Sequence, residues 1–321
     1  MSNLNMVEAI NLALKQEMEK NKDIVLLGED IGINGGVFRV TEGLYKKFPN
    51  RVVDTPISES GIIGISIGMA IYGLKPVAEI QFEGFTYPAL DQLISHAARF
   101  RNRTRNNMTA SLVLRSPWGG GVKALEHHSE SPETYFAHTP GLKVVIPSCP
   151  YDAKGLLISA IRDKNPVIFL EPKKLYRSIK QDVPEEEYAI PIGKANILSE
   201  GSDLTLITYG SFVRTVIPII NSLPYSIELI DLRTLSPIDY ETIINSVKKT
   251  GRAIILHEAP RTLGIGAEIS ALIMENALLN LEAPVLRVTG YDVVTPALKL
   301  EDYYRPDEAK IKRAIERVMN F

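Results

Sequence analysis

Apolar stretches rich in β-branched residues alternate along the chain with segments in which apolar residues recur at helical spacing. In the first half, such stretches predict strands at residues 24–27, 77–80, 111–115, 143–146 and 167–170. Apolar residues three or four positions apart predict helices between them, at residues 89–101 and 153–162. This alternation is typical of an α/β fold with mostly parallel sheets and helices on both faces.

The pattern changes between residues 171 and 200 and then resumes. Prolines and the acidic run 185–187 predict a linker that crosses the surface of the protein. Beyond it, further strands are predicted at residues 204–208, 227–230, 253–257 and 285–288. We therefore expect two α/β domains, which comprise residues 1–190 and residues 191–321.

One helix of the second half has clear end signals. Ser236 is predicted to cap it, Pro237 fits its first turn, and Gly251 follows its end. At the N-terminus, Val7, Ile10, Leu14 and Met18 also follow helical spacing, and acidic residues among them exclude a transit peptide.

Residues 61–74 carry no charge, and Glu59 stands just before them. A run of this length is shorter than the roughly 20 residues that cross a bilayer, so it predicts a helix buried in protein. Gly61, Gly64 and Gly68 recur at helical spacing, which permits another backbone to approach closely. We expect Glu59 to be shielded from water by this helix.

Composition and charge exclude several classes of function. The 321 residues are 45% hydrophobic and carry a net charge of −2, so no bias toward nucleic acid or a membrane surface is visible. Cys149 is the one cysteine, which excludes an intrachain disulfide framework and favours a cytoplasmic location. The basic run Arg99, Arg101, Arg103 and Arg105 lacks an aromatic stacking set and predicts a solvated or subunit-contacting surface.

Two short motifs are weak matches to known sites. Residues 64–68 fit the G-x-S-x-G pattern of serine hydrolases, but the turn chemistry lies earlier, at residues 58–61. Ser66 is therefore predicted to lie inside the helix, away from any nucleophile position. Residues 264–269 begin like a dinucleotide fingerprint, but Ile269 occupies the place of the final small residue.

The segment 116–133 contains stronger candidates for chemistry. Gly119, Gly120 and Gly121 suit a loop whose backbone approaches another group closely. His127 and His128 follow, without the cysteine or carboxylate spacing of a zinc site. A histidine at the end of such a loop is either structural or an acid–base group, because its side chain titrates near neutral pH.

Residues 159–166 end a helix with oxygen-bearing side chains. Asp163 and Asn165 add oxygens beside the unpaired carbonyls of the last turn, which suits a monovalent or calcium-like cation. A plain Asx-rich helix stop before proline is the alternative.

Several longer motifs, taken in order, resemble one known family. They are LLGED (26–30), DTPISE (54–59), EIQFEGFTYPALDQ (79–92), HHSESPE (127–133), HTPGLKVVIPS (138–148), AKGLLISAIRDKNPVIFLEPKKLYR (153–177) and IPIGKA (190–195). The sequence resembles the beta subunit of the thiamine-diphosphate-dependent 2-oxo acid dehydrogenases over nearly its whole length. Residues 170–177 and 232–252 are most similar to the branched-chain 2-oxoisovalerate type, and the related pyruvate and acetoin enzymes share most of the motifs.

The resemblance implies a thiamine-diphosphate-binding pyrimidine fold followed by a transketolase C-terminal-like α/β domain. It implies that Glu59 hydrogen-bonds a ring nitrogen of the aminopyrimidine. The other implied cofactor contacts are Glu29, Ile57, Ser58, Gln81 and Phe85. The implied substrate pocket comprises Phe82, Phe85, Tyr87 and His128.

Further roles follow from the same resemblance. It implies that His128 transfers protons during reductive acylation of the lipoyl group carried by the acyltransferase core. It implies a structural potassium site at Leu112, Ala160, Ile161, Asp163 and Asn165. Phe321 and Asp292 are candidates for docking onto the acyltransferase core.

The chain lacks the G-D-G motif with which free-standing thiamine enzymes hold magnesium and the diphosphate. We therefore expect an alpha subunit to complete the site and to hold most of the magnesium contacts, in a heterotetramer of two alpha and two beta chains. The chain alone is predicted to be inactive. A serine hydrolase and a non-catalytic α/β binding protein are the remaining alternatives.

Overall fold

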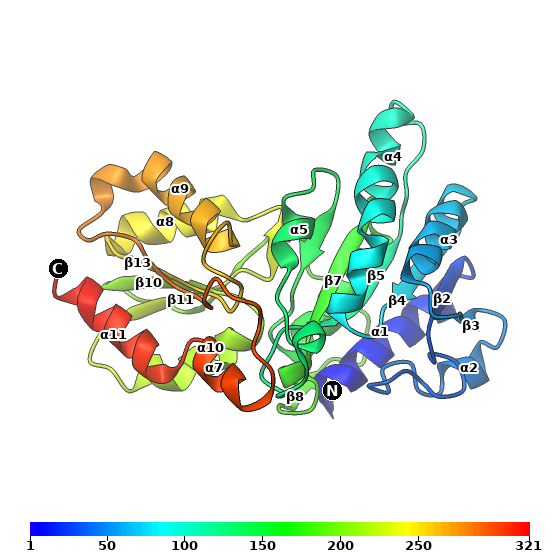
Figure 1. Ribbon diagram of the computed structural model, residues 1–321, viewed down its shortest axis with the longest axis horizontal. Helices are drawn as coiled ribbons and strands as arrows, with labels where there is room; N and C mark the ends of the chain where they lie inside the picture. The colour runs from blue at the N-terminus through cyan, green and yellow to red at the C-terminus, as the bar shows by residue number, and fades with distance from the viewer.

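The computed structural model describes residues 1–321 and contains two large sheets, each flanked by helices, and one two-stranded sheet (Figure 1). The elements of the first half are β1 (Ser2–Leu4), α1 (Met6–Lys20), β2 (Ile24–Gly28), α2 (Leu44–Lys47), β3 (Val52–Asp54), α3 (Glu59–Ile71), β4 (Lys75–Glu79), α4 (Ala98–Arg103), β5 (Val113–Trp118), α5 (Glu133–Ala137), β6 (Lys143–Val145), α6 (Pro150–Arg162), β7 (Val167–Pro172) and β8 (Gln181–Val183). Those of the second half are β9 (Asn196–Ser199), β10 (Leu204–Thr208), α7 (Ser211–Asn221), β11 (Ile227–Asp231), β12 (Thr234–Ser236), α8 (Tyr240–Thr250), β13 (Ala253–Leu256), α9 (Ile265–Ala277), β14 (Leu286–Val288), α10 (Glu301–Tyr304) and α11 (Glu308–Met319).

The first sheet has seven strands in the order β12-β6-β7-β5-β4-β2-β3. All of its pairs are parallel except β12 with β6, which is antiparallel. The second sheet has five strands in the order β14-β13-β10-β11-β9, with only β9 antiparallel. The α/β class and the mostly parallel sheets predicted from the sequence are confirmed.

Helices cover both faces of each sheet, as the alternating sequence pattern predicted. In the second sheet, α8 and α9 lie on one side and α7 and α11 on the other (Figure 1). One buried apolar cluster contains Ile63 and Leu93 of the first half together with Ile230 and Ile269 of the second. The two halves therefore share one continuous core layer.

None of the helices combines the length and apolarity that a membrane crossing needs.

Several local predictions are confirmed and others are wrong. Helix α1, predicted from the helical spacing of its apolar residues, begins with a capping box: the Asn5 side chain accepts from the Glu8 N–H at 3.0 Å, and Glu8 accepts from the Asn5 N–H at 2.8 Å. The cap of α8 is Asp239 and not Ser236, which ends strand β12 instead. Gly251 follows α8 with a positive φ of 67°, as predicted.

Two segments depart from their predicted conformation. The predicted helix at residues 89–101 is a succession of a 3₁₀ segment (Glu83–Ala89), a π segment (Gln92–Ala97) and α4. The predicted linker from residue 171 begins inside β7, and β8 within it pairs with β1. The division after residue 190 stays a prediction, and the pairing of β12 with β6 crosses it.

A buried ion cluster joins three neighbouring strands of the first sheet. The Arg115 guanidinium on β5 donates to Glu79 on β4 at 2.7 Å and to both carboxylate oxygens of Glu171 on β7 at 2.7 and 3.1 Å. The Tyr176 hydroxyl donates to Glu171 at 2.7 Å. Burial raises the pKa of Glu79, and the guanidinium opposes that shift.

We predict that Arg115→Met destabilises the fold, because it leaves two buried carboxylates without their cation. Loss of one partner of a buried ion pair costs roughly 3–5 kcal/mol. Denaturant unfolding measures the change, and Lys20→Met, which breaks an exposed pair with Glu187, is the control. A stability of Arg115→Met within about 1 kcal/mol of that control contradicts the prediction.

Candidate active site

The candidate cofactor residues gather where strands β2, β3 and β4 end. These strands are parallel, so the loops that follow them meet at the same edge of the sheet. Glu29 follows β2, Ile57 and Ser58 follow β3, and Gln81 follows β4. The Gln81 side chain donates to the Asp30 carboxylate at 3.5 Å, which ties the β4 loop to the β2 loop.

Two carboxylates of this edge interact with each other. Glu59 is the first residue of α3, and Glu29 is only 7% exposed. The pKa of Glu29 is raised, first by burial and then by the negative charges of Glu59 and Asp30. Contrary to our expectation, Glu59 is only half-buried. The two residues before it are themselves exposed, Ile57 to 83%, and they do not cover its side chain.

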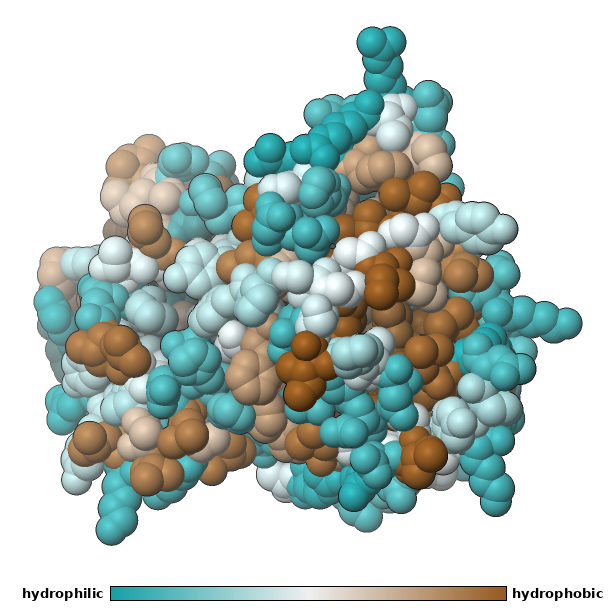
Figure 2. All heavy atoms as spheres, turned by 45° about the vertical axis from the view of Figure 1, so that its right-hand side comes forward, coloured by the Kyte–Doolittle hydropathy of each residue, from teal (hydrophilic) through white to brown (hydrophobic).

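Helix α3 is buried on one face only. Ser66 is buried and its hydroxyl donates to the Ile62 carbonyl at 2.8 Å, so it has no access to a substrate. Ile65 and Tyr72 on the opposite face are 59% and 89% exposed, and nothing approaches Gly68. The expectation that the whole run 61–74 is buried is therefore wrong within this chain. Apolar residues also gather on this side of the molecule in Figure 2.

His128 lies against two phenylalanine rings. Its ring centroid is 3.9 Å from that of Phe82 and 5.3 Å from that of Phe85. Its pKa is lowered, first by burial and then by the positive charge of Lys173. Gly84 permits this contact, because a Cβ atom there would overlap the His127 carbonyl oxygen. His127 itself is exposed.

The structure separates Tyr87 from the other predicted pocket residues. Phe82 and Phe85 meet edge to face at 6.1 Å, with His128 against both. The Tyr87 hydroxyl instead donates to Glu130, and its ring faces that of Tyr135. Tyr87 therefore links the 3₁₀ segment Glu83–Ala89 to Glu130, in the segment that follows His128.

Two contributors to this site were missed in the sequence. Phe38 packs edge to face on Phe82 at 5.4 Å, although it lies in an irregular loop with no periodic signal. Lys173 is 5% exposed, and burial lowers its pKa to about 8 against the opposing charges of Glu83 and Glu258. The only signal for Lys173 was its place within the family-like motif at residues 170–177.

The predicted cation ligands do come together at the end of α6. The Asp163 carboxylate pairs with the Lys143 ammonium at 2.5 Å, and the Ile161 carbonyl accepts from the Lys75 ammonium at 3.3 Å. The Asn165 side chain accepts from Arg101 at 2.8 Å. The Leu112 and Ala160 carbonyls accept backbone N–H groups. Each of these oxygens thus already pairs with a donor of this chain, and Lys75, Arg101 and Lys143 place positive charge around them.

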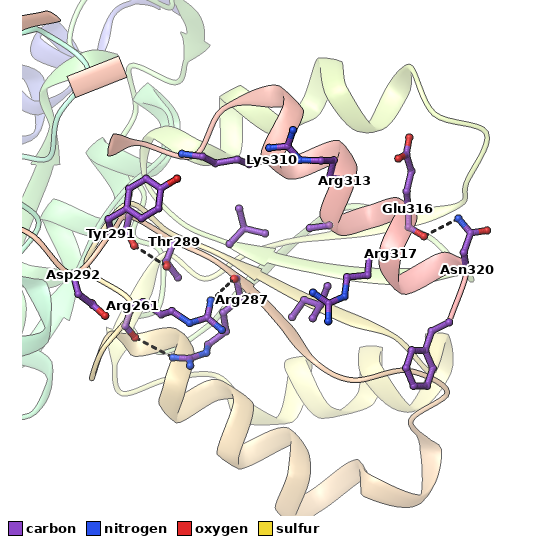
Figure 3. Close-up of a pocket in the computed structure, with 15 residues that line it drawn as sticks. Arg261, Arg287, Thr289, Tyr291, Asp292, Lys310, Arg313, Glu316, Arg317 and Asn320 are labelled. Carbon is purple, nitrogen blue, oxygen red and sulfur yellow. Dashed lines mark hydrogen bonds between the residues drawn. The ribbon is translucent and has the colours of Figure 1, made fainter. Parts of the chain in front are cut away.

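A cavity lies in the second half of the chain, beside strand β14 and helix α11. It has a volume of about 1040 Å³, and its lining includes Asp292 (Figure 3) and Phe321. Its remaining wall is rich in basic side chains, which are Arg261, Arg287, Lys310, Arg313 and Arg317. The Asp292 pKa is lowered by hydrogen bonds from the N–H and hydroxyl of Thr262, each 2.8 Å long.

Comparisons with known proteins agree with the two-sheet architecture. Residues 2–179 match the family "Transketolase, pyrimidine binding domain" and residues 193–311 match "Transketolase, C-terminal domain". A solved structure titled "Split gene transketolase, inactive beta4 tetramer" has a TM-score of 0.77 over 99% of each chain at 21% identity, which supports the fold alone. The fold therefore belongs to the transketolase class.

Sequence relatives define the family more closely. The chain is 52% identical to the "Pyruvate dehydrogenase E1 component subunit beta" of Acholeplasma laidlawii, over 99% of this chain and 98% of that one. It is 49% identical to the protein of the same name from Staphylococcus epidermidis, over the full length of both. The chain belongs to the beta subunits of the thiamine-diphosphate-dependent 2-oxo acid dehydrogenases.

We predict that Lys173→Met raises the pKa of His128, because a nearby positive charge disfavours the protonated imidazole. The measurement is an NMR titration of the imidazole resonances, with the His128 signal assigned from His128→Gln. Lys174→Met removes the neighbouring ammonium, which is not among the main causes of the shift in the His128 pKa, and is the control. Equal His128 titration curves for Lys173→Met and wild type contradict the prediction.

Proposed function

We propose that this chain is the beta subunit of a pyruvate dehydrogenase E1 component and acts with an alpha subunit. The observation that carries the proposal is its similarity, over the whole length, to two proteins of that name at 52% and 49% identity. The branched-chain preference expected from residues 170–177 and 232–252 has no support among these names. The pyruvate alternative is therefore the better proposal.

The residues present fit the pyrimidine half of a thiamine diphosphate site. Glu59 is open to solvent on one side, Phe85 offers a half-buried ring face, and the backbone of Ile57 and Ser58 is exposed beside them. These residues form an open, shallow site. A flat heterocycle can bind there with one face against this chain, and a second protein chain can cover the other face. Bound thiamine diphosphate supplies the electron sink for decarboxylation.

The proposed role of this chain is to bind the aminopyrimidine of thiamine diphosphate and to control protons beside it. Glu59 would hydrogen-bond a ring nitrogen of the aminopyrimidine, and Phe85 would pack on the ring. Glu29 holds a proton more readily than an isolated acid, so it would support Glu59 by limiting the negative charge at the edge. Gln81 would orient the loop through Asp30.

His128 would serve as the acid–base group for acyl transfer to the lipoyl group. Its lowered pKa keeps the imidazole neutral at pH 7, and a neutral imidazole can accept a proton. Phe82 and Phe85 would form the apolar side of the substrate pocket. Such a pocket discriminates one methylene by about 1–3 kcal/mol, so the alpha subunit would contribute to the choice of 2-oxo acid.

The remaining contacts of the complex are proposed from surface features. The diphosphate and most of the magnesium ligands would belong to the alpha subunit, because the sequence has no G-D-G motif. The exposed apolar face of α3, with Ile65 and Tyr72, would pack against another chain of a heterotetramer with two alpha and two beta subunits.

Two outer sites complete the proposal. The cavity with Asp292 and Phe321 would receive the lipoyl-bearing acyltransferase core, and retained binding after removal of Phe321 would argue against it. The oxygens of Leu112, Ala160, Ile161, Asp163 and Asn165 would hold a structural potassium ion. Equal melting temperatures in potassium and choline chloride would argue against that ion.

We predict that the chain decarboxylates 2-oxo acids only after assembly with its alpha subunit, thiamine diphosphate and magnesium. Pyruvate is expected to give a higher kcat/KM than 2-oxoisovalerate or 4-methyl-2-oxopentanoate. Carbon dioxide release measures all three, with each chain alone as the control. Activity of the isolated chain would refute the half-site, and a preference for 2-oxoisovalerate would restore the branched-chain interpretation.

We further predict that Glu59→Gln in the assembled enzyme preserves the fold and removes decarboxylation. The amide cannot exchange a proton with the aminopyrimidine, whereas its volume is nearly unchanged. Glu241→Gln, at the exposed first turn of α8, is the matched control and keeps full activity. Near-normal turnover of Glu59→Gln would show that Glu59 is only a helix-start acid.

A further inference from the structure

The glycine loop at residues 119–123 is held by carboxylates from both halves of the chain. The Gly119 N–H donates to Glu83 and the Gly120 N–H donates to Glu258, each at 3.3 Å. Glu301 accepts from the N–H of Gly121, and it accepts from the N–H of Lys123 at 2.8 Å. Glu258 and Glu301 belong to the second half, so that half holds a loop of the first.

These carboxylates have little freedom to move. Glu258 and Glu301 are buried, and the Arg305 guanidinium donates to the second oxygen of Glu258 at 2.8 Å. A buried carboxylate without hydrogen bonds is costly, so the backbone N–H groups and the acids stabilise one another. The loop and the second half therefore form one rigid unit.

Glycine is required for this arrangement. A Cβ atom at Gly119 would overlap the Glu258 carboxylate, and one at Gly120 would overlap that of Glu301. Gly119 and Gly121 also have positive φ angles of 77° and 94°, which side chains rarely adopt. The three glycines predicted to permit a close approach thus bring the backbone against acids of the same chain.

His128 follows this anchored loop directly. Glu301 binds at Gly121 and Lys123, and the 3₁₀ turn Glu126–His128 begins three residues later. The His128 N–H donates to the Leu125 carbonyl at 2.9 Å, which transmits the position of the loop to the histidine. The rings of Phe82 and Phe85 contact the imidazole without any hydrogen bond. Gly84 and Tyr87 contact the residues on either side of His128, so the glycine loop is one of two anchors of its backbone.

We propose that Glu301 is a positioning residue for His128, supported by Glu258 and Arg305. The proposal rests on the proposed role of His128 in acyl transfer to the lipoyl group. Glu301 touches neither the candidate cofactor residues nor the imidazole, and it acts by fixing the backbone from which His128 projects. A displacement of about 1 Å at a reacting group can lower a rate by about a hundredfold.

The test uses the assembled enzyme with alpha subunit, thiamine diphosphate and magnesium. Glu301→Ala is made in the wild-type background and in His128→Gln. Two rates are measured for each protein, namely reductive acylation of a lipoylated acyltransferase domain and 2-oxo acid decarboxylation with an artificial electron acceptor. The control is Asp302→Asn, which breaks an exposed ion pair to Lys123 of the same loop at 2.7 Å.

Glu301→Ala is expected to lower the rate of reductive acylation about tenfold or more, while decarboxylation stays within about twofold of wild type. In the His128→Gln background, the same change is expected to lower acylation by less than about twofold, because two residues that act as one unit are not additive. Asp302→Asn is expected to leave both rates within about twofold.

Three results would overturn the positioning role. They are an unchanged acylation rate in Glu301→Ala, an equal loss in both backgrounds, and a loss of decarboxylation as large as that of acylation. If Glu301→Ala does not assemble, Glu301→Gln gives the same comparison, because it keeps the volume but turns an amide N–H toward one backbone donor. A wild-type assembly without decarboxylase activity would instead refute the proposed function.

Discussion

The geometry of the site depends on the buried ion cluster around the Arg115 guanidinium. The guanidinium holds Glu79 and Glu171 together, and with them the ends of three adjacent strands. Glu171 binds Tyr176, whose ring packs on Phe38 at 5.1 Å, and Phe38 packs on Phe82. A continuous series of contacts thus joins the ion cluster beneath the sheet edge to the aromatic side of the candidate site.

Acidic groups are concentrated around this site, and their surroundings differ. Glu29 has its pKa raised by burial and by neighbouring acids. Glu133 is buried, its pKa is about 8 because of that burial, and it accepts hydrogen bonds from Trp118 and Tyr209. Glu258 and Glu301 accept from backbone N–H groups, and Glu258 also accepts from the Arg305 guanidinium. Three of these hydrogen bonds, from Tyr209 to Glu133, from Gly120 to Glu258 and from Lys123 to Glu301, join the two halves of the chain. The same contacts therefore stabilise the buried acids and hold the two halves together.

The sequence predicted nine of the strands, the α/β class and the glycine loop because these have local patterns. It missed β1, β8, β9 and β12, which have only three or four residues each. It misplaced the start of α8, since Ser236 and Asp239 are both good caps and the pairing of β12 with β6 occupies Ser236. It also predicted complete burial of α3, because a helix apolar on all sides gives no sign of which face another chain covers. The contacts of Glu301 with the glycine loop join positions far apart in sequence, and no spacing rule could have found them.

Strand β12 makes the sheet of the first half depend on a segment of the second half. It comes from the second half of the chain, yet it forms the outer strand of the first sheet beside β6. A fragment that ended at residue 190 would leave the N–H and C=O groups of β6 open to pairing with strands of other molecules. The first half on its own would therefore present an uncovered sheet edge, and its resistance to aggregation depends on the strand that the second half supplies.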